Sequence, residues 1–278
     1  MKRAFQDIAV VAGLVTLSLG SSPLLAQKPK SQKEQQAILA VQLAKDPDER
    51  VKAIENVLTN FADTEFKVIL LQAALQTEEQ KNDYAQMVFY GERLLKADPN
   101  NAFALVTLAS ETARHTREND LDKDEQLGKV DKWAKQGIEA AKAMPKATPA
   151  ESDEDLDRDR KSLEAQGYLA LGMADFLRKN SDGAVANYRQ SLATEPTPNP
   201  GTYIRLAQVY MSTGKLDDAN FTLDKAINTP NVADQIKSIA MNFKAQIAKA
   251  KGKEGAGGSS PAAPAAPASP ASPAGSQH

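Results

Sequence analysis

The chain has 278 residues, of which 41% are hydrophobic and only 5% aromatic, and its formal net charge is −2. This composition favours packed helices over a sandwich or barrel, and no long stretch alternates polar and apolar residues with the period of a strand. The near-neutral charge gives no basic field, so a nucleic-acid partner is not expected.

The first 26 residues predict an export signal. Lys2 and Arg3 precede an apolar run from Ile8 to Leu19, and the segment Gly-Ser-Ser-Pro-Leu-Leu-Ala follows at residues 20–26. An apolar core of about 12 residues is short for a membrane span, which needs roughly 20. We therefore expect cleavage after Ala26, no membrane span in the mature chain, and a bacterial periplasmic or secreted location. The alternative is an uncleaved anchor. The chain has no cysteine, which excludes disulfides and a lipid attached to an N-terminal cysteine.

After a short linker at residues 27–33, small, aromatic and leucine residues recur about every 34 residues from Glu34 to Ala233. The clearest copies are Tyr168, Leu171, Gly172, Ala184, Tyr188, Pro196 and then Tyr203, Leu206, Ala207, Tyr210, Ala219, Leu223, Ala226. This period describes two antiparallel helices per unit, in which small residues let the backbones approach and large side chains fill the holes between them. A single pair cannot bury its apolar face, so successive pairs are expected to stack.

The repeats predict a helical region over residues 34–251. Its units are 34–67, 68–101, 102–147, 165–198 and 200–233. The third unit is lengthened by about ten residues, and an acidic helix or linker at 148–164 follows it. Residues 234–251 carry apolar side chains at helical spacing and predict a capping helix over the last open face. Residues 252–278, almost entirely Gly, Ala, Pro and Ser, predict a disordered tail.

The spacing of these residues resembles the tetratricopeptide repeat family, most closely over residues 165–198 and 200–233. Asp175, Ser191 and Glu65 depart from the family pattern. The resemblance implies an all-α fold, a right-handed α-solenoid of about five helix pairs plus a C-terminal capping helix. It also implies that the first helix of each pair lines a concave groove that binds a peptide or protein.

The same resemblance supplies candidate groove residues. The polar candidates are Gln42, Gln72, Gln76, Thr107, Ser110, Arg205 and Gln208, and the apolar candidates are Leu169, Met173, Phe176 and Leu177. Amides beside an apolar stretch suit an extended peptide, because amides can pair with its backbone while apolar side chains supply burial. The alternative for residues 169–177 is a place in the core, against the acidic segment before them.

Three features suggest catalytic or metal chemistry, and each has a simpler interpretation. The acids from Asp153 to Glu164 have the spacing of a calcium loop, but Arg158 stands where that loop needs glycine, so we interpret the segment as a helix capped by Ser152. The acids from Asp120 to Asp124 fail for the same reason. His115 lies near the end of a predicted helix, where a cation complements the helix dipole. With no catalytic motif or phosphate loop, we expect no enzyme activity, metal or cofactor.

The sequence therefore predicts an exported, non-enzymatic scaffold or adaptor that binds a peptide or protein partner, in envelope assembly or secretion. The alternative is a structural homo-oligomer whose groove is filled by its own tail or by a neighbouring subunit. An enzyme with an unrecognised site is a more distant third interpretation.

Overall fold

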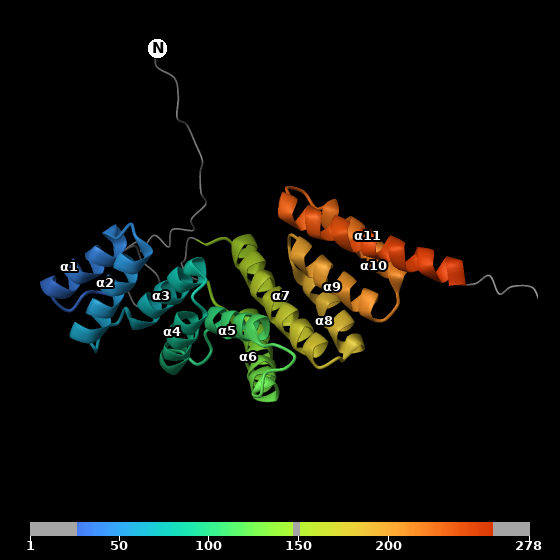
Figure 1. Ribbon diagram of the computed structural model, residues 1–278. Coiled ribbons are helices and arrows are strands. Elements are labelled where there is room, and N and C mark those ends of the chain that lie inside the picture. Colours follow the sequence, from blue (N-terminus) through green and yellow to red (C-terminus); the bar gives the residue numbers. More distant parts are fainter. Residues whose placement is uncertain (1–26, 147–150, 258–278) are drawn as a thin grey trace, which may run out of the picture. The chain divides into compact units, whose positions relative to one another are not determined.

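The computed structural model describes residues 27–146 and 151–257 (Figure 1). Every regular element in these ranges is an α-helix, which confirms the predicted all-α fold. The helices are α1 (Gln32–Leu43), α2 (Pro47–Asn60), α3 (Lys67–Lys81), α4 (Tyr84–Ala97), α5 (Ala102–His115), α6 (Lys123–Ala143), α7 (Asp153–Leu177), α8 (Ser181–Thr194), α9 (Pro200–Ser212), α10 (Leu216–Ile227) and α11 (Asp234–Gly257). The predicted export signal, and the tail beyond residue 257, lie outside the described residues.

A polar side chain caps the N-terminus of most of these helices. Seven helices (α1, α2, α4, α5, α7, α8 and α9) start at a residue whose side chain accepts a backbone N–H of the first turn: Ser31, Asp46, Asp83, Asn101, Ser152, Asn180 and Asn199. Each such cap is typically worth about 1 kcal/mol, because it satisfies a donor that has no partner inside the helix. The predicted helix start at Ser152 is confirmed, since its Oγ accepts the N–H of Asp155 at 3.0 Å.

Two compact units make up the chain, one ending at Pro198 and one beginning at Asn199. In the first unit α1 packs on α2, α3 on α4, α5 on α6 and α7 on α8, and successive pairs meet through α2–α3, α4–α5 and α6–α7 (Figure 1). In the second unit α9 packs on α10, and α11 covers both. Contacts that run mainly between neighbours along the chain are those of an α-solenoid.

Helix α5 is the most deeply buried element of the first unit. Ala102 and every residue from Ala104 to Ala113 are buried, because α5 packs against α4, α6 and α7. A buried cluster formed mainly by α2, α3 and α4 adjoins it through Ala104. Leu70, Leu71 and Leu75 of α3 belong to that cluster and are at most 1% exposed. Polar side chains on α3 and α5 are therefore held on a rigid framework.

The helix crossing between α7 and α8 has the small residues that the repeat pattern placed there. Gly172 and Ala184 are both buried. A Cβ atom added to Gly172 would lie 2.6 Å from both Cδ1 and Cε1 of Tyr188, well inside van der Waals contact. Tyr188 is itself only 1% exposed. Glycine at position 172 thus allows the two helices to approach, as the repeat interpretation required.

Helix α7 differs from the predicted division of the chain. The acidic segment predicted at 148–164 and the first helix of the unit predicted at 165–198 form one continuous helix. No proline interrupts the sequence, and Leu156 and Ala165 in its first half are buried. Arg160 also anchors this half by donating from Nε to the carbonyl oxygen of Met144, just past the end of α6, at 2.9 Å.

The third helix pair and the last helix differ in length from a regular repeat. The insertion expected in the third unit falls in the connection 116–122 and in the longer helix α6. Helix α11 continues to Gly257 instead of ending at residue 251, and no proline interrupts it. Within the described ranges, no helix combines the length and the apolarity that a membrane crossing requires.

Candidate binding surface

Two neighbouring first helices, α3 and α5, carry most of the polar groove candidates. On α3, Gln72 and Gln76 lie one turn apart and are half-buried, and Glu79 continues the same side of the helix. The structure gives neither amide a polar partner among the residues it describes. An amide supplies both donors and an acceptor, so this side of α3 can pair with either type of backbone group.

On α5 three polar side chains are almost completely enclosed. Thr107 is 3% exposed, Ser110 7% and Glu111 4%. Within the described residues, Thr107 Oγ1, Ser110 Oγ and Glu111 Oε2 have no hydrogen-bond partner. Buried polar atoms are paired in most proteins, because leaving one unpaired costs about 1–3 kcal/mol. This side of α5 is therefore polar and unsatisfied in a helix that is otherwise buried.

Glu79 in the last turn of α3 and Glu111 in the last turns of α5 interact electrostatically. Although Glu79 keeps part of its surface in solvent, partial burial of its carboxyl raises its pKa, and so does the nearby carboxylate of Glu111. Arg114, the next turn of α5, acts in the opposite direction and lies 3.2 Å from Glu111 Oε1 through its Nη1. We call Gln72, Gln76, Glu79, Thr107, Ser110, Glu111 and Arg114 the α3–α5 face.

His115 closes the end of this face in a structural role. Its ring stacks on Tyr84 of α4, with centroids 4.1 Å apart and planes 11° from parallel. Its Nδ1 lies 2.9 Å from the carbonyl oxygen of Glu111, in the last turn of α5. His115 is the last residue of α5, which confirms the expected position near the C-terminal end of a helix.

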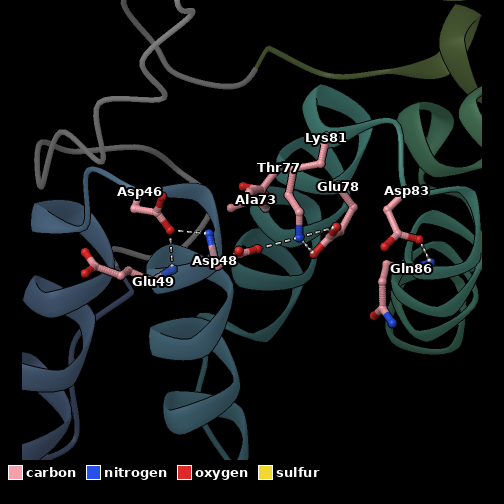
Figure 2. Close-up of polar contacts among 9 residues, drawn as sticks. All are labelled: Asp46, Asp48, Glu49, Ala73, Thr77, Glu78, Lys81, Asp83 and Gln86. Carbon is pink, nitrogen blue, oxygen red and sulfur yellow. Dashed lines mark hydrogen bonds and ion pairs between the residues drawn. The ribbon is translucent and has the colours of Figure 1, made fainter.

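Lys81 fixes the C-terminal end of α3 (Figure 2). Its Nζ lies 2.7 Å from Asp48 Oδ1 of α2 and 3.0 Å from Oε2 of Glu78, which is 1% exposed. Hydrogen bonds to Asp48 and then Glu78 raise the pKa of Lys81. Asp46 holds this arrangement in place, because its Oδ1 accepts the N–H groups that begin α2, including that of Asp48. Lys81 thereby joins the first helix pair to the second.

The remaining candidates are distributed differently. Gln42 is exposed on α1, while Arg205 and Gln208 are half-buried on α9 in the second unit. Of the apolar candidates on α7, Leu169 and Leu177 are half-buried, Met173 is 4% exposed and Phe176 is 39% exposed. Gln72 and Gln76 thus lie on α3, and Thr107 and Ser110 on α5, the first helices of successive pairs. The binding role of every candidate stays a prediction.

Sequence reasoning did not identify Glu79, Glu111 and Arg114. Helical spacing offered a signal for them, because Glu79 follows Gln72 by two turns and Arg114 follows Thr107 by two turns. The missing information was that the carboxyl groups of Glu79 and Glu111, on different helices, interact electrostatically.

A separate cleft of about 530 Å³ lies on the acidic half of α7. It is lined by Glu154, Asp157, Arg158, Lys161 and Glu164 of α7 and by Ala193, Thr194, Glu195 and Pro196 at the end of α8. Burial raises the pKa of Glu195. Nowhere in the described part of the chain are three or more His, Cys, Asp or Glu side chains grouped so that they could hold a metal ion.

Comparison with known proteins supports the repeat interpretation. The tetratricopeptide repeat family model matches residues 176–238. Curated protein sequences gave no match. Among solved structures, PilW, described as a widely conserved type IV pilus biogenesis factor, is similar with a TM-score of 0.50 and 15% identity, over 79% of this chain and 90% of PilW.

A thermophilic tetratricopeptide repeat protein from Thermus thermophilus is also similar, with a TM-score of 0.47 and 21% identity, over 75% of this chain and 97% of that protein. The likeness to PilW concerns the fold. The family match and the paired helices identify tetratricopeptide repeats over residues 176–238, and the other helix pairs share the fold of such proteins.

Proposed function

We propose that this protein is a non-enzymatic scaffold that binds an extended segment of a protein partner on the α3–α5 face. The observation that carries the proposal is the pair of half-buried amides on α3, Gln72 and Gln76, which have no polar partner within the described residues. Both amides keep part of their surface in solvent, so a partner can reach their donors and acceptors, whereas Thr107, Ser110 and Glu111 on α5 are enclosed.

The spacing of the amides suits an extended chain. One helical turn separates Gln72 and Gln76 by about 6 Å along α3. Alternate residues of an extended strand are about 6.7 Å apart and present their backbone N–H and C=O groups in the same direction. Two amides at this spacing can therefore pair with every second residue of the partner, whatever its side chains.

The location and process are also proposals. We infer export from Lys2, Arg3 and the apolar run Ile8–Leu19, and therefore place the partner in the bacterial envelope or outside the cell. Envelope assembly or secretion is the process that fits such a location. Mass spectrometry of the mature chain in an exporting host tests the first step: we expect Gln27 at its start, and an intact Met1 on membrane-bound protein would contradict export.

Photocrosslinking from a single residue tests the binding face. We would replace Gln76 on α3 with a photoreactive phenylalanine, and Lys96, exposed on α4, in a control variant. Irradiation of host cells should give an adduct with a protein that mass spectrometry identifies from the Gln76 variant only. Equal adducts from both positions would refute the face, and adducts only with a second copy of this chain would favour the oligomer.

A further inference from the structure

We propose that the exposed side of α1 is a contact surface between two copies of this chain, which associate as a symmetric dimer centred on Ala40. This inference concerns residues outside the α3–α5 face and goes beyond the proposed function.

Helix α1 holds two large apolar side chains in solvent. Leu39 is 48% exposed and Leu43 is 67% exposed. They lie one helical turn apart and therefore on the same side of the helix, where Gln36 and Ala40 are also exposed. Single exposed apolar side chains are ordinary on protein surfaces, whereas contiguous ones mark interaction sites.

The same side of the first helix is buried in the next two repeat units. Gln36, Ala40 and Leu43 occupy the third, seventh and tenth positions of the unit that begins at residue 34. The residues at these positions of the following units are Leu70, Ala74 and Thr77 on α3 and Ala104, Leu108 and Glu111 on α5, and each of them is at most 4% exposed.

In the later units this side packs on the last helix of the preceding pair. Helix α3 packs on α2, and α5 packs on α4. Leu108 reaches α4 closely, because a Cβ atom added to Gly91 would lie 2.7 Å from Leu108 Cδ2. Ala40 is the counterpart of Leu108 on α1, and no helix of the described ranges precedes α1. The surface that later units bury between pairs is therefore open on α1.

The charge of this surface favours a second copy as the occupant. Residues 35–43 contain no charged side chain, although 25% of the residues of the chain are charged. A symmetric contact places the same surface on both sides, so a charged surface would repel its own copy, whereas an uncharged one does not. Gln36 can pair across the contact, because an amide supplies both donors and an acceptor. Ala40, in the middle of the row, lets two helices approach closely.

A head-to-tail contact with α11 of another copy fits this surface less well. Helix α11 exposes Lys249, and residues 35–43 of α1 offer no acid to pair with its ammonium group. Covering an unpaired charge is costly. Such a contact would also continue into open chains of molecules instead of closing at two.

The absence of cysteine from the chain allows a direct test. Ala40→Cys would introduce a single thiol, and a contact centred on this position would bring two such thiols within reach of a disulfide. Phe89→Cys, on the exposed side of α4, is the matched control. Under mild oxidation of the whole protein purified from an exporting host, we expect a disulfide-linked dimer from Ala40→Cys only.

Sedimentation equilibrium measures the association without a cross-link. The wild type should form a dimer whose fraction rises with protein concentration. Leu43→Glu should weaken dimerisation about tenfold or more, because the contact would then remove a carboxylate of each copy from water. Phe89→Glu makes a similar change at a side chain that is 50% exposed, and it should leave dimerisation unchanged.

Each other result would overturn the inference. A wild type that stays monomeric at every concentration, equal disulfide-linked dimers from both cysteine variants, or a Leu43→Glu variant that dimerises as the wild type does would refute the α1 contact. Assemblies that keep growing beyond the dimer would assign α1 to a head-to-tail contact. If circular dichroism shows that Leu43→Glu is unfolded, Ala40→Cys decides alone.

Discussion

Replacing Gly172 with alanine tests the helix packing on which the repeat fold depends. The added Cβ would lie 2.6 Å from Cδ1 and Cε1 of Tyr188 and 3.1 Å from its Cγ. Because Tyr188 is only 1% exposed, its ring cannot move aside without displacing other core atoms. Overpacking of this kind typically costs about 1–3 kcal/mol. Alanine recovers up to about 1 kcal/mol of helix propensity. We therefore expect the free energy of unfolding of Gly172→Ala to fall by up to about 2 kcal/mol.

Gly128 provides a matched control. It is an exposed glycine within α6, and an added Cβ would meet no atom within 4 Å. Gly128→Ala should therefore show the helix-propensity gain alone, a stabilisation of up to about 1 kcal/mol. The same chemical change should shift stability in opposite directions at the two positions.

Urea unfolding followed by far-ultraviolet circular dichroism measures both variants. Because stacked helix pairs can unfold in more than one step, the midpoints of the transitions should be compared before any free energy is extracted. A lower midpoint for Gly172→Ala and an equal or higher one for Gly128→Ala are expected. If Gly172→Ala were stabilised as much as the control, the close approach of α7 and α8 would be refuted.

Three further predictions follow from the packing and the charges. Lys81→Met should lower the urea midpoint more than Lys96→Met, because it leaves a buried α3 carboxylate without its cation, and equal shifts would argue against the pair. Met173→Glu should melt early or aggregate, since burying an unpaired carboxylate costs on the order of several kcal/mol, while Phe176→Glu should melt almost as the wild type does, in thermal scans by circular dichroism. Burial raises the pKa of Glu195, so its stabilising contribution is present in acid and is lost as pH rises through its folded-state pKa. The variant Glu195→Gln should therefore raise the melting temperature at about pH 7 but not at about pH 3.5. Equal shifts of the melting temperature at both pH values would contradict this.

Local sequence signals were enough to predict the helices. The spacing of Gly172, Ala184 and Tyr188 predicted a helix crossing because small and large side chains must alternate wherever two helices touch, and the structure confirms that contact. The cap at Ser152 was predictable for the same reason: a hydroxyl before a run of acids satisfies the first turn of a helix without help from distant residues.

Properties that depend on neighbours distant in the sequence could not be predicted. The continuity of α7 depends on burial of Leu156 and on the anchoring of Arg160 to the end of α6. Met173 is 4% exposed and Phe176, three residues further along α7, is 39% exposed, a contrast that the apolar pattern alone could not resolve. The electrostatic effect of Glu111 on the pKa of Glu79 likewise joins two different helices, which local spacing could not predict.

Hydrogen exchange of the full chain, with and without the partner captured at Gln76, tests the central claim most directly. Amides in α3 and α5 should exchange more slowly in the complex, because a bound segment suppresses the local opening of the helices that it contacts. Exchange in α4, whose residue Lys96 serves as the crosslinking control, should change less. Slower exchange confined to α4 or to α9–α11, with α3 and α5 unaffected, would contradict binding on the α3–α5 face.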